Sequence, residues 1–188
     1  MISTRGGVKH LVYEPGVNVR IVNNRGNAIK KLFVNGKKYD VTLDLIVVPE
    51  LKDENVYIEF NGPRYQGSLL FGSCAALKQI PGDLFADYPS MNNFSMTFTA
   101  CKSLQSIPAS LFDNQRNITN VLSIFTGCTS LTGESPYTMV GDKKVHLYER
   151  YNYPEYFVEQ PDSYISHMQA FTDCTGLTDY AQIPSSWK

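Results

Sequence analysis

The sequence predicts a mainly β protein with minor helical content, in which a small N-terminal antiparallel sheet precedes a short solenoid of stacked repeats. Two observations carry this prediction. Apolar and polar residues alternate in short segments before residue 62, and the pattern Phe-x-x-Cys-x-x-Leu occurs four times after it. A tyrosine-rich stretch interrupts the repeats and predicts a hairpin insertion.

The chain divides near Gly62-Pro63. We expect residues 1–62 to form a β domain with an extended N-terminal arm, and residues 63–188 to form the repeat domain, with its insertion at 134–170. Apolar residues make up 43% and charged residues 19%, an ordinary balance for a globular protein. A chain of this length can bury a sizeable core without disulfides or metals.

Four segments before the boundary carry strand signals. They are Val17–Ile21, Ala28–Val34, Val41–Val47 and Val56–Phe60. Alternation of apolar and polar residues is typical of a strand with one buried face. Asn35-Gly36 lies between strand-like runs and predicts a hairpin turn, because both residues tolerate positive φ.

The repeats have a regular spacing. Their phenylalanines are Phe71, Phe98, Phe125 and Phe171, separated by steps of 27, 27 and 46 residues. A unit of this length cannot bury its own apolar side, so we expect the copies to stack with equivalent residues in contact. In the first two copies Leu-x-x-Ile-Pro predicts a short strand ending in a bend, and the Leu-Phe that follows predicts a helical or 3₁₀ turn.

The four cysteines occupy the same position in the four copies. They are Cys74, Cys101, Cys128 and Cys174. This register indicates packing, and the parallel side chains of stacked equivalent residues do not favour a disulfide. No Cys-x-x-Cys pair supports zinc or thioredoxin-type chemistry. We expect free, buried thiols.

The extended motif, Phe-x-x-Cys-x-x-Leu-x-x-Ile-Pro followed by Leu-Phe, resembles the BspA-like class of leucine-rich repeat over residues 65–188. The closing run from Cys174 to Pro184 is also similar to repeat proteins encoded by gut Bacteroidetes and their phages. The resemblance implies a leucine-rich-repeat solenoid with a role in adhesion or surface recognition. The N-terminal sheet and the Trp187 end would cap the stack.

The insertion is the region for which we favour a function. Tyr137–Val140 and Val145–Tyr148 flank Gly141-Asp142 and predict a hairpin. Six of the twelve tyrosines lie between residues 137 and 164, and tyrosine is enriched at interfaces. The candidate interaction surface consists of Tyr137, His146, Tyr148, Tyr151, Tyr153, Tyr156 and Tyr164. An equally supported alternative is that the insertion only packs over the side of the repeats.

No catalytic, cofactor or metal site is predicted. The histidines His10, His146 and His167 are scattered, and the sequence contains no Ser-His-Asp set, phosphate-binding loop or paired catalytic acids in a defensible context. The acidic residues of the insertion lack the spacing of a calcium loop. A net charge of −1 argues against nucleic acid, and no apolar window reaches the ~20 residues of a membrane span.

Two lysine pairs, Lys30-Lys31 and Lys37-Lys38, bracket the Asn35-Gly36 turn. Lysines at a hairpin commonly prevent a sheet edge from pairing with another chain. The alternative is that they face an anionic partner.

We expect a non-enzymatic interaction or structural protein that acts as an oligomer or within a larger assembly. Its expected partners are proteins, either virion subunits or a surface receptor, and the alternative partner is a glycan. The first residues lack an apolar stretch of signal-peptide length, which fits an intracellular chain, a chain without its leader, or a virion part released by lysis. We favour a bacteriophage virion structural or decoration component of head or tail-fibre type, on the virion surface, with residues 1–16 docking on neighbouring subunits. The alternatives are a bacterial cell-surface or extracellular adhesin and, third, a glycan-acting enzyme, which needs two carboxylates about 5–10 Å apart in a cleft.

Overall fold

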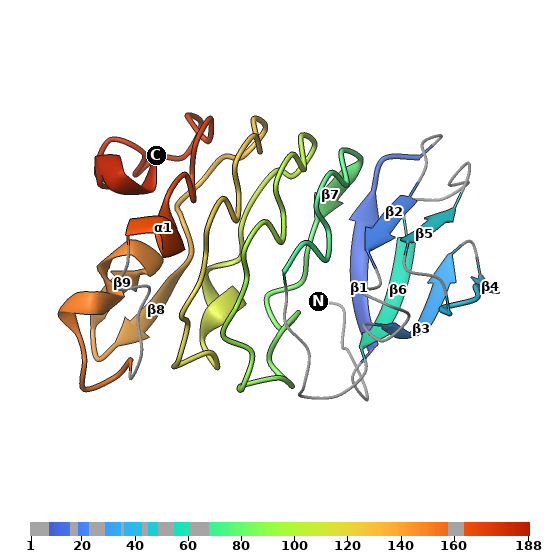
Figure 1. Ribbon diagram of the computed structural model, residues 1–188, viewed down its shortest axis with the longest axis horizontal. Coiled ribbons are helices and arrows are strands. Elements are labelled where there is room, and N and C mark those ends of the chain that lie inside the picture. Colours follow the sequence, from blue (N-terminus) through green and yellow to red (C-terminus); the bar gives the residue numbers. More distant parts are fainter. Residues whose placement is uncertain are drawn as a thin grey trace.

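The computed structural model describes residues 8–15, 19–22, 29–34, 36–42, 45–48, 55–60, 68–157 and 164–188 (Figure 1). Among them, helix is confined to the four-residue α1 (Tyr164–His167) and the short 3₁₀ turns η1 (Ala109–Phe112), η2 (Leu147–Asn152) and η3 (Ser185–Trp187). The predicted mainly β class is confirmed. None of the described helices is long and apolar enough to span a bilayer.

A five-stranded antiparallel sheet occupies the N-terminal end of the molecule (Figure 1). In spatial order its strands are β4 (Lys37–Lys38), β3 (Ile29–Val34), β6 (Asn55–Phe60), β1 (Val8–Tyr13) and β7 (Leu77–Gln79). A separate antiparallel pair joins β2 (Val19–Val22) to β5 (Leu45–Val48). The predicted antiparallel sheet is confirmed.

The predicted strands are observed with shifted ends. β3 and β4 form the hairpin predicted at Asn35-Gly36, with Val34 opposite Lys37 and a φ of +68° at Gly36. The strand predicted from Val41 begins only at β5, because the Asp40 carboxylate accepts the Thr42 backbone N–H at 2.9 Å and holds a turn there. Residues 17–18, 28, 35 and 43–44 of these predictions lie outside the described residues.

The prediction of an N-terminal docking arm over residues 1–16 is wrong for residues 8–13, which form β1 in the interior of the sheet between β6 and β7. Leu11 and Tyr13 are fully buried. Lys9 is also buried, and its Nζ lies 3.3 Å from Asp83 and 2.9 Å from Asp87 in the first repeat. Because both faces of this strand are buried, its sequence lacks the alternation of apolar and polar residues that predicted the other strands. Residues 1–7 lie outside the described residues.

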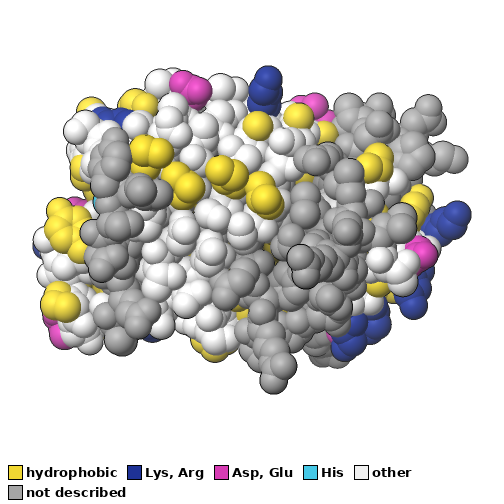
Figure 2. Space-filling model, in the orientation of Figure 1, with side chains coloured by type: hydrophobic (Ala, Val, Ile, Leu, Met, Phe, Trp, Pro, Cys, Tyr) yellow, Lys and Arg dark blue, Asp and Glu magenta, His cyan; other side chains and the backbone are white. Residues whose placement is uncertain are grey.

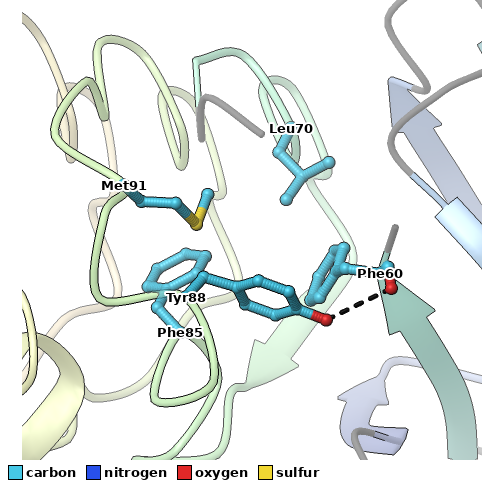
Figure 3. A pocket seen from close by; sticks show the side chains of 5 residues that line it. All are labelled: Phe60, Leu70, Phe85, Tyr88 and Met91. Carbon is cyan, nitrogen blue, oxygen red and sulfur yellow. Dashed lines mark hydrogen bonds between the residues drawn. The ribbon is translucent and has the colours of Figure 1, made fainter. Parts of the chain in front are cut away.

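The sheet and the repeats share a core across the boundary predicted at residue 62. Strand β7 belongs to the first repeat, and yet it pairs with β1. The rings of Phe60 and Phe71 meet edge to face with centroids 6.5 Å apart. The Tyr88 hydroxyl donates a hydrogen bond to the Phe60 carbonyl at 3.2 Å (Figure 3). One hydrophobic cluster therefore joins the two predicted parts.

The four copies of the motif lie side by side, joined by backbone hydrogen bonds (Figure 1). Each motif phenylalanine donates its N–H, at 2.9 Å, to the residue that precedes the phenylalanine of the next copy. The acceptors for the first three copies are Thr97, Ile124 and Ala170. In the fourth copy the acceptor is Trp187, which takes the place that a fifth copy would fill.

The phenylalanine rings form a ladder inside this stack. Centroids from Phe71 to Phe98, Phe125 and Phe171 are 5.5, 5.4 and 5.6 Å apart, with nearly parallel planes. Phe60 covers one end of the ladder and Trp187, 6.4 Å from Phe171, covers the other. The expected capping by the sheet and by the Trp187 end is therefore observed as ring contacts.

The cysteines form a second ladder beside the rings. All four are free and buried, as predicted. The thiols of Cys101, Cys128 and Cys174 donate to the carbonyl of the phenylalanine one copy earlier, at 3.2, 3.0 and 3.1 Å. Cys74 has no earlier copy, and its thiol lies near the buried Tyr13 of β1. The motif cysteine thus fills space and adds a second hydrogen bond to a carbonyl that already accepts a backbone N–H.

Each copy also holds two residues in the left-handed region, with φ between 51° and 72°. One lies two residues before the phenylalanine, and the other directly precedes the cysteine. The first set is Leu69, Met96, Ser123 and Gln169, and the second is Ser73, Ala100, Gly127 and Asp173. Every described non-glycine residue with positive φ belongs to these sets. The stack therefore imposes a backbone conformation that disfavours most of these side chains.

Gly127 and Ala100 occupy the same left-handed position in two copies, and substitutions at these two residues test this strain. A Cβ added at Gly127 would meet only ordinary contacts, the nearest being Ala100 Cα at 3.6 Å. Gly127→Ala should therefore lower the free energy of unfolding by about 1 kcal/mol through φ alone, and Ala100→Gly should leave it unchanged or raise it by up to about 1 kcal/mol. Urea unfolding measures both values. A stabilising Gly127→Ala would contradict the assigned conformation.

The thiol ladder predicts slow alkylation of the native protein. Burial raises the pKa of Cys101 and of Cys174 above the ordinary thiol value, so less thiolate is present at any given pH. Iodoacetamide at mildly alkaline pH should label none of the four cysteines in the folded chain and all four in denaturant, as read by intact mass. Rapid labelling of a native thiol would show that the ladder is open.

Candidate interaction site

The insertion begins with the predicted hairpin, which is confirmed. Strands β8 (Tyr137–Val140) and β9 (Lys143–His146) pair antiparallel with Val140 opposite Lys143. Gly141 in the two-residue turn has a φ of +59°, which glycine adopts without strain. The 3₁₀ turn η2 follows β9 directly and carries the chain away from the hairpin.

Arg150 in η2 anchors the insertion to the second copy. Its side chain is buried, and its two terminal nitrogens donate to the carbonyls of Gln115 and Phe112, both at 2.9 Å. One of them also donates to the Thr138 hydroxyl at 2.8 Å, and the Phe157 ring covers the guanidinium at 4.4 Å. Burial lowers the pKa of Arg150 to about 9, an effect that the nearby charge of Asp113 opposes.

The hydrogen bonds from Arg150 to backbone carbonyls repeat a type of contact that also occurs in the first two copies. In copy one the Tyr88 hydroxyl donates back to Phe60 of the sheet. In copy two the Gln115 amide, 27 residues later, donates back to the carbonyls of Phe85 and Tyr88 at 2.7 and 3.2 Å. Arg150 then donates to Phe112 and Gln115, which are the equivalents of Phe85 and Tyr88 one copy on. The insertion thus completes the third layer of the stack.

A second set of polar contacts ties the hairpin to the fourth copy. Buried Asp179 accepts the Ser135 N–H at 2.9 Å, the Ser135 hydroxyl, and the Tyr148 hydroxyl at 3.3 Å. His146 lies between two carboxylates, with Nδ1 3.0 Å from Glu149 and Nε2 3.5 Å from Asp179. Burial raises the pKa of Tyr148 further above that of an exposed tyrosine. This cluster is enclosed, so its contacts hold the fold.

The structure divides the predicted interaction surface into buried and exposed members. His146 and Tyr148 are buried, and their rings stack on each other at 5.3 Å. Tyr137 and Tyr153 are half-buried beneath the ammonium groups of Lys144 and Lys143, at 4.6 and 5.0 Å from the ring centroids. These four side chains pack within the insertion or against lysines.

Two tyrosines remain open to solvent. Tyr151 is 60% exposed and Tyr156 is 45% exposed, within a turn closed by the Tyr156 N–H bond to the Tyr153 carbonyl at 3.0 Å. The side chain of Tyr164 lies outside the described residues. Residues 151–156, the tyrosine tip, are therefore the part of the predicted surface that a partner can reach.

Sequence reasoning missed Arg150, Asp179 and Gln115. Arg150 follows no pattern in the sequence, since it lies in the longer third copy. Gln115 lies at the same position in its copy as Tyr88 does in the copy before. A tyrosine and a glutamine differ in chemistry, so the sequence does not indicate that they share a role. Only the position of the carbonyls that they meet reveals it.

Two further hollows are lined by residues outside the insertion. The apolar one between Phe60, Leu70, Phe85, Tyr88 and Met91 leaves no room for a water molecule (Figure 3). A polar hollow of about 210 Å³ between copies one and two is lined by two acidic residues, Asp83 and Asp113. Asp83 is paired with Lys9 and Asp113 accepts the Thr138 hydroxyl, so both favour a structural role. No group of three or more metal-ligating side chains occurs among the described residues.

Comparison with known proteins adds no relative. No protein-family model matches the chain. No curated protein and no solved structure matches it either.

Removing the Arg150 guanidinium should loosen the insertion. Arg150→Met removes the guanidinium donor from the Gln115 carbonyl and the Thr138 hydroxyl, and one of two donors from the Phe112 carbonyl, so we expect the free energy of unfolding to fall by about 3 kcal/mol. Arg116 also lies over Phe157, at 5.7 Å, but is exposed, so Arg116→Met should change the value by less than about 0.5 kcal/mol. Denaturant unfolding compares the two variants. Equal effects would show that Arg150 is not an anchor.

Proposed function

We propose that this chain is a non-enzymatic leucine-rich-repeat solenoid that serves as a binding and structural module. The stacked copies, their aromatic and thiol ladders and the capped ends support the solenoid. The resemblance of the motif to BspA-like repeats supports a role in surface recognition. In this proposal the repeats form a rigid support, and the insertion makes the contact.

The tyrosine tip is the observation that carries the proposal. Tyr151 and Tyr156 expose large rings at the end of a segment whose base is fixed by Arg150. Tyrosine rings gain much on being covered and lose little side-chain entropy, and they are common in the centres of interfaces. A rigid base reduces the ordering that binding requires. The partner that suits this tip is a protein surface.

The setting that we propose is the surface of a phage particle, where the chain would act as a structural or decoration component. A bacterial cell surface is the second setting. Both rest on the class of repeat that the motif resembles. Contacts with other subunits would then make the protein part of a larger assembly.

Quantitative mass spectrometry of purified particles tests the tip and the setting together. The wild-type chain should be present in the particles. The double variant Tyr151→Ser, Tyr156→Ser should fold normally and be depleted from them by roughly tenfold or more, because two interface rings commonly contribute over ~1.4 kcal/mol.

Tyr57 provides the matched control. It is 41% exposed and lies on β6, in the sheet. Tyr57→Ser should remain in the particles at the wild-type level. Particles without the wild-type chain would exclude the phage setting, and particles that keep the double variant would exclude the tip as the contact.

A further inference from the structure

Positive charge gathers at the end of the molecule formed by β3 and β4. Figure 2 shows Lys and Arg side chains clustered there, and Figure 1 places β4 at the outer edge of the sheet. Lys30, Lys31, Lys37 and Lys38 supply this charge. The described residues place no carboxylate within ion-pair distance of Lys37 or Lys38.

A β-bulge brings the first lysine pair to one carboxylate. The register shifts between Ile29 and Lys31, so that two residues of β3 face one residue of β6. Lys30 and Lys31 therefore both reach Glu59, each at 2.7 Å. Their hydrogen bonds lower the pKa of Glu59, and the shared carboxylate neutralises only one of the two ammonium groups.

A hollow of about 330 Å³ opens between the two lysine pairs. It is lined by Lys30, Lys38, Tyr39, Asp40 and Val41. Its volume matches the smaller ligand sites of proteins. The Asp40 carboxylate accepts hydrogen bonds from the backbone N–H and the side chain of Thr42, and its two oxygens can together accept further donors.

We propose that this lysine hollow binds an acidic sugar, such as a uronic acid unit of a polysaccharide. The ammonium groups of Lys30 and Lys38 receive the sugar carboxylate, and Asp40 accepts a sugar hydroxyl. Tyr39 and Val41 provide apolar surface for the C–H face of the ring. Among the described residues, four lysines face two carboxylates in this region, Glu59 and Asp40, so an anionic ligand is favoured over a neutral one.

Protection of the sheet edge accounts for lysines on β4, but it does not require a hollow that combines cations, a carboxylate and an aromatic ring. A simple anion without hydroxyl groups uses the lysines but offers no donor to Asp40. A sugar uses all of the lining groups, and this favours it over an acidic peptide. The site lies away from the tyrosine tip and does not depend on the function proposed for it.

Titration calorimetry of the full chain tests the proposal with three probes. They are a hexamer of galacturonic acid, a neutral hexamer of galactose and a hexaglutamate peptide. The galacturonic acid hexamer should bind at least roughly tenfold more tightly than the other two, and its affinity should fall as salt rises from about 20 mM to about 200 mM.

Two single variants locate the site. Lys38→Gln should weaken binding of the galacturonic acid hexamer by roughly tenfold, which corresponds to ~1.4 kcal/mol. Lys143→Gln is the matched control, since Lys143 is also an exposed lysine beside a second lysine on a short hairpin strand, and it should bind like wild type. Both variants should unfold at the wild-type temperature because both side chains are exposed.

Three results would overturn the proposal. Absence of binding, or unchanged binding by Lys38→Gln, would remove the site. Equal affinity for hexaglutamate would assign the lysines to an acidic protein surface. Equal affinity for the neutral hexamer would show that charge does not select the ligand.

Discussion

The hydrogen bonds between equivalent backbones of adjacent copies are the constraint on which the rest of this structure depends. They fix neighbouring phenylalanine N–H groups at 2.9 Å from their acceptors and hold the rings about 5.5 Å apart. At that spacing each copy must present the same side chain at the same height. The cysteine meets this requirement because its small thiol packs beside the rings and donates to the carbonyl of the phenylalanine one copy earlier. The left-handed residues follow from the same requirement, since the backbone must turn at fixed points in every copy.

The same constraint explains how a copy that is 19 residues longer leaves the stack intact. On the return side of each layer, a side chain adds donors to the carbonyls of the layer before it. Tyr88 and Gln115 do this from the same register, whereas Arg150 does it from within the insertion. A long guanidinium with several donors reaches two carbonyls from a different backbone position, which a shorter side chain could not do. The extra residues are then free to form the hairpin and the tyrosine tip.

The two surfaces that we propose to bind other molecules therefore lie outside the core. The tyrosine tip lies near the C-terminal end of the stack, and the lysine hollow lies at the outer edge of the sheet (Figure 1). Between them the polar cluster around Asp179 and the Lys9 ion pairs are committed to holding layers together. The two surfaces on which the proposals rest therefore lie at different ends of the described structure.

The sequence by itself determined the strands with clean alternation, the hairpins at Asn35-Gly36 and Gly141-Asp142, the stacking register and the free thiols, because each follows from local periodicity or from a repeated position. It also pointed to the insertion. Only the tertiary structure decided that residues 8–13 complete the sheet, that His146 and Tyr148 are buried while Tyr151 and Tyr156 are exposed, and that Arg150 is the anchor. Those outcomes depend on which carbonyls and carboxylates come to lie opposite a side chain after folding, and no local pattern in the chain encodes that.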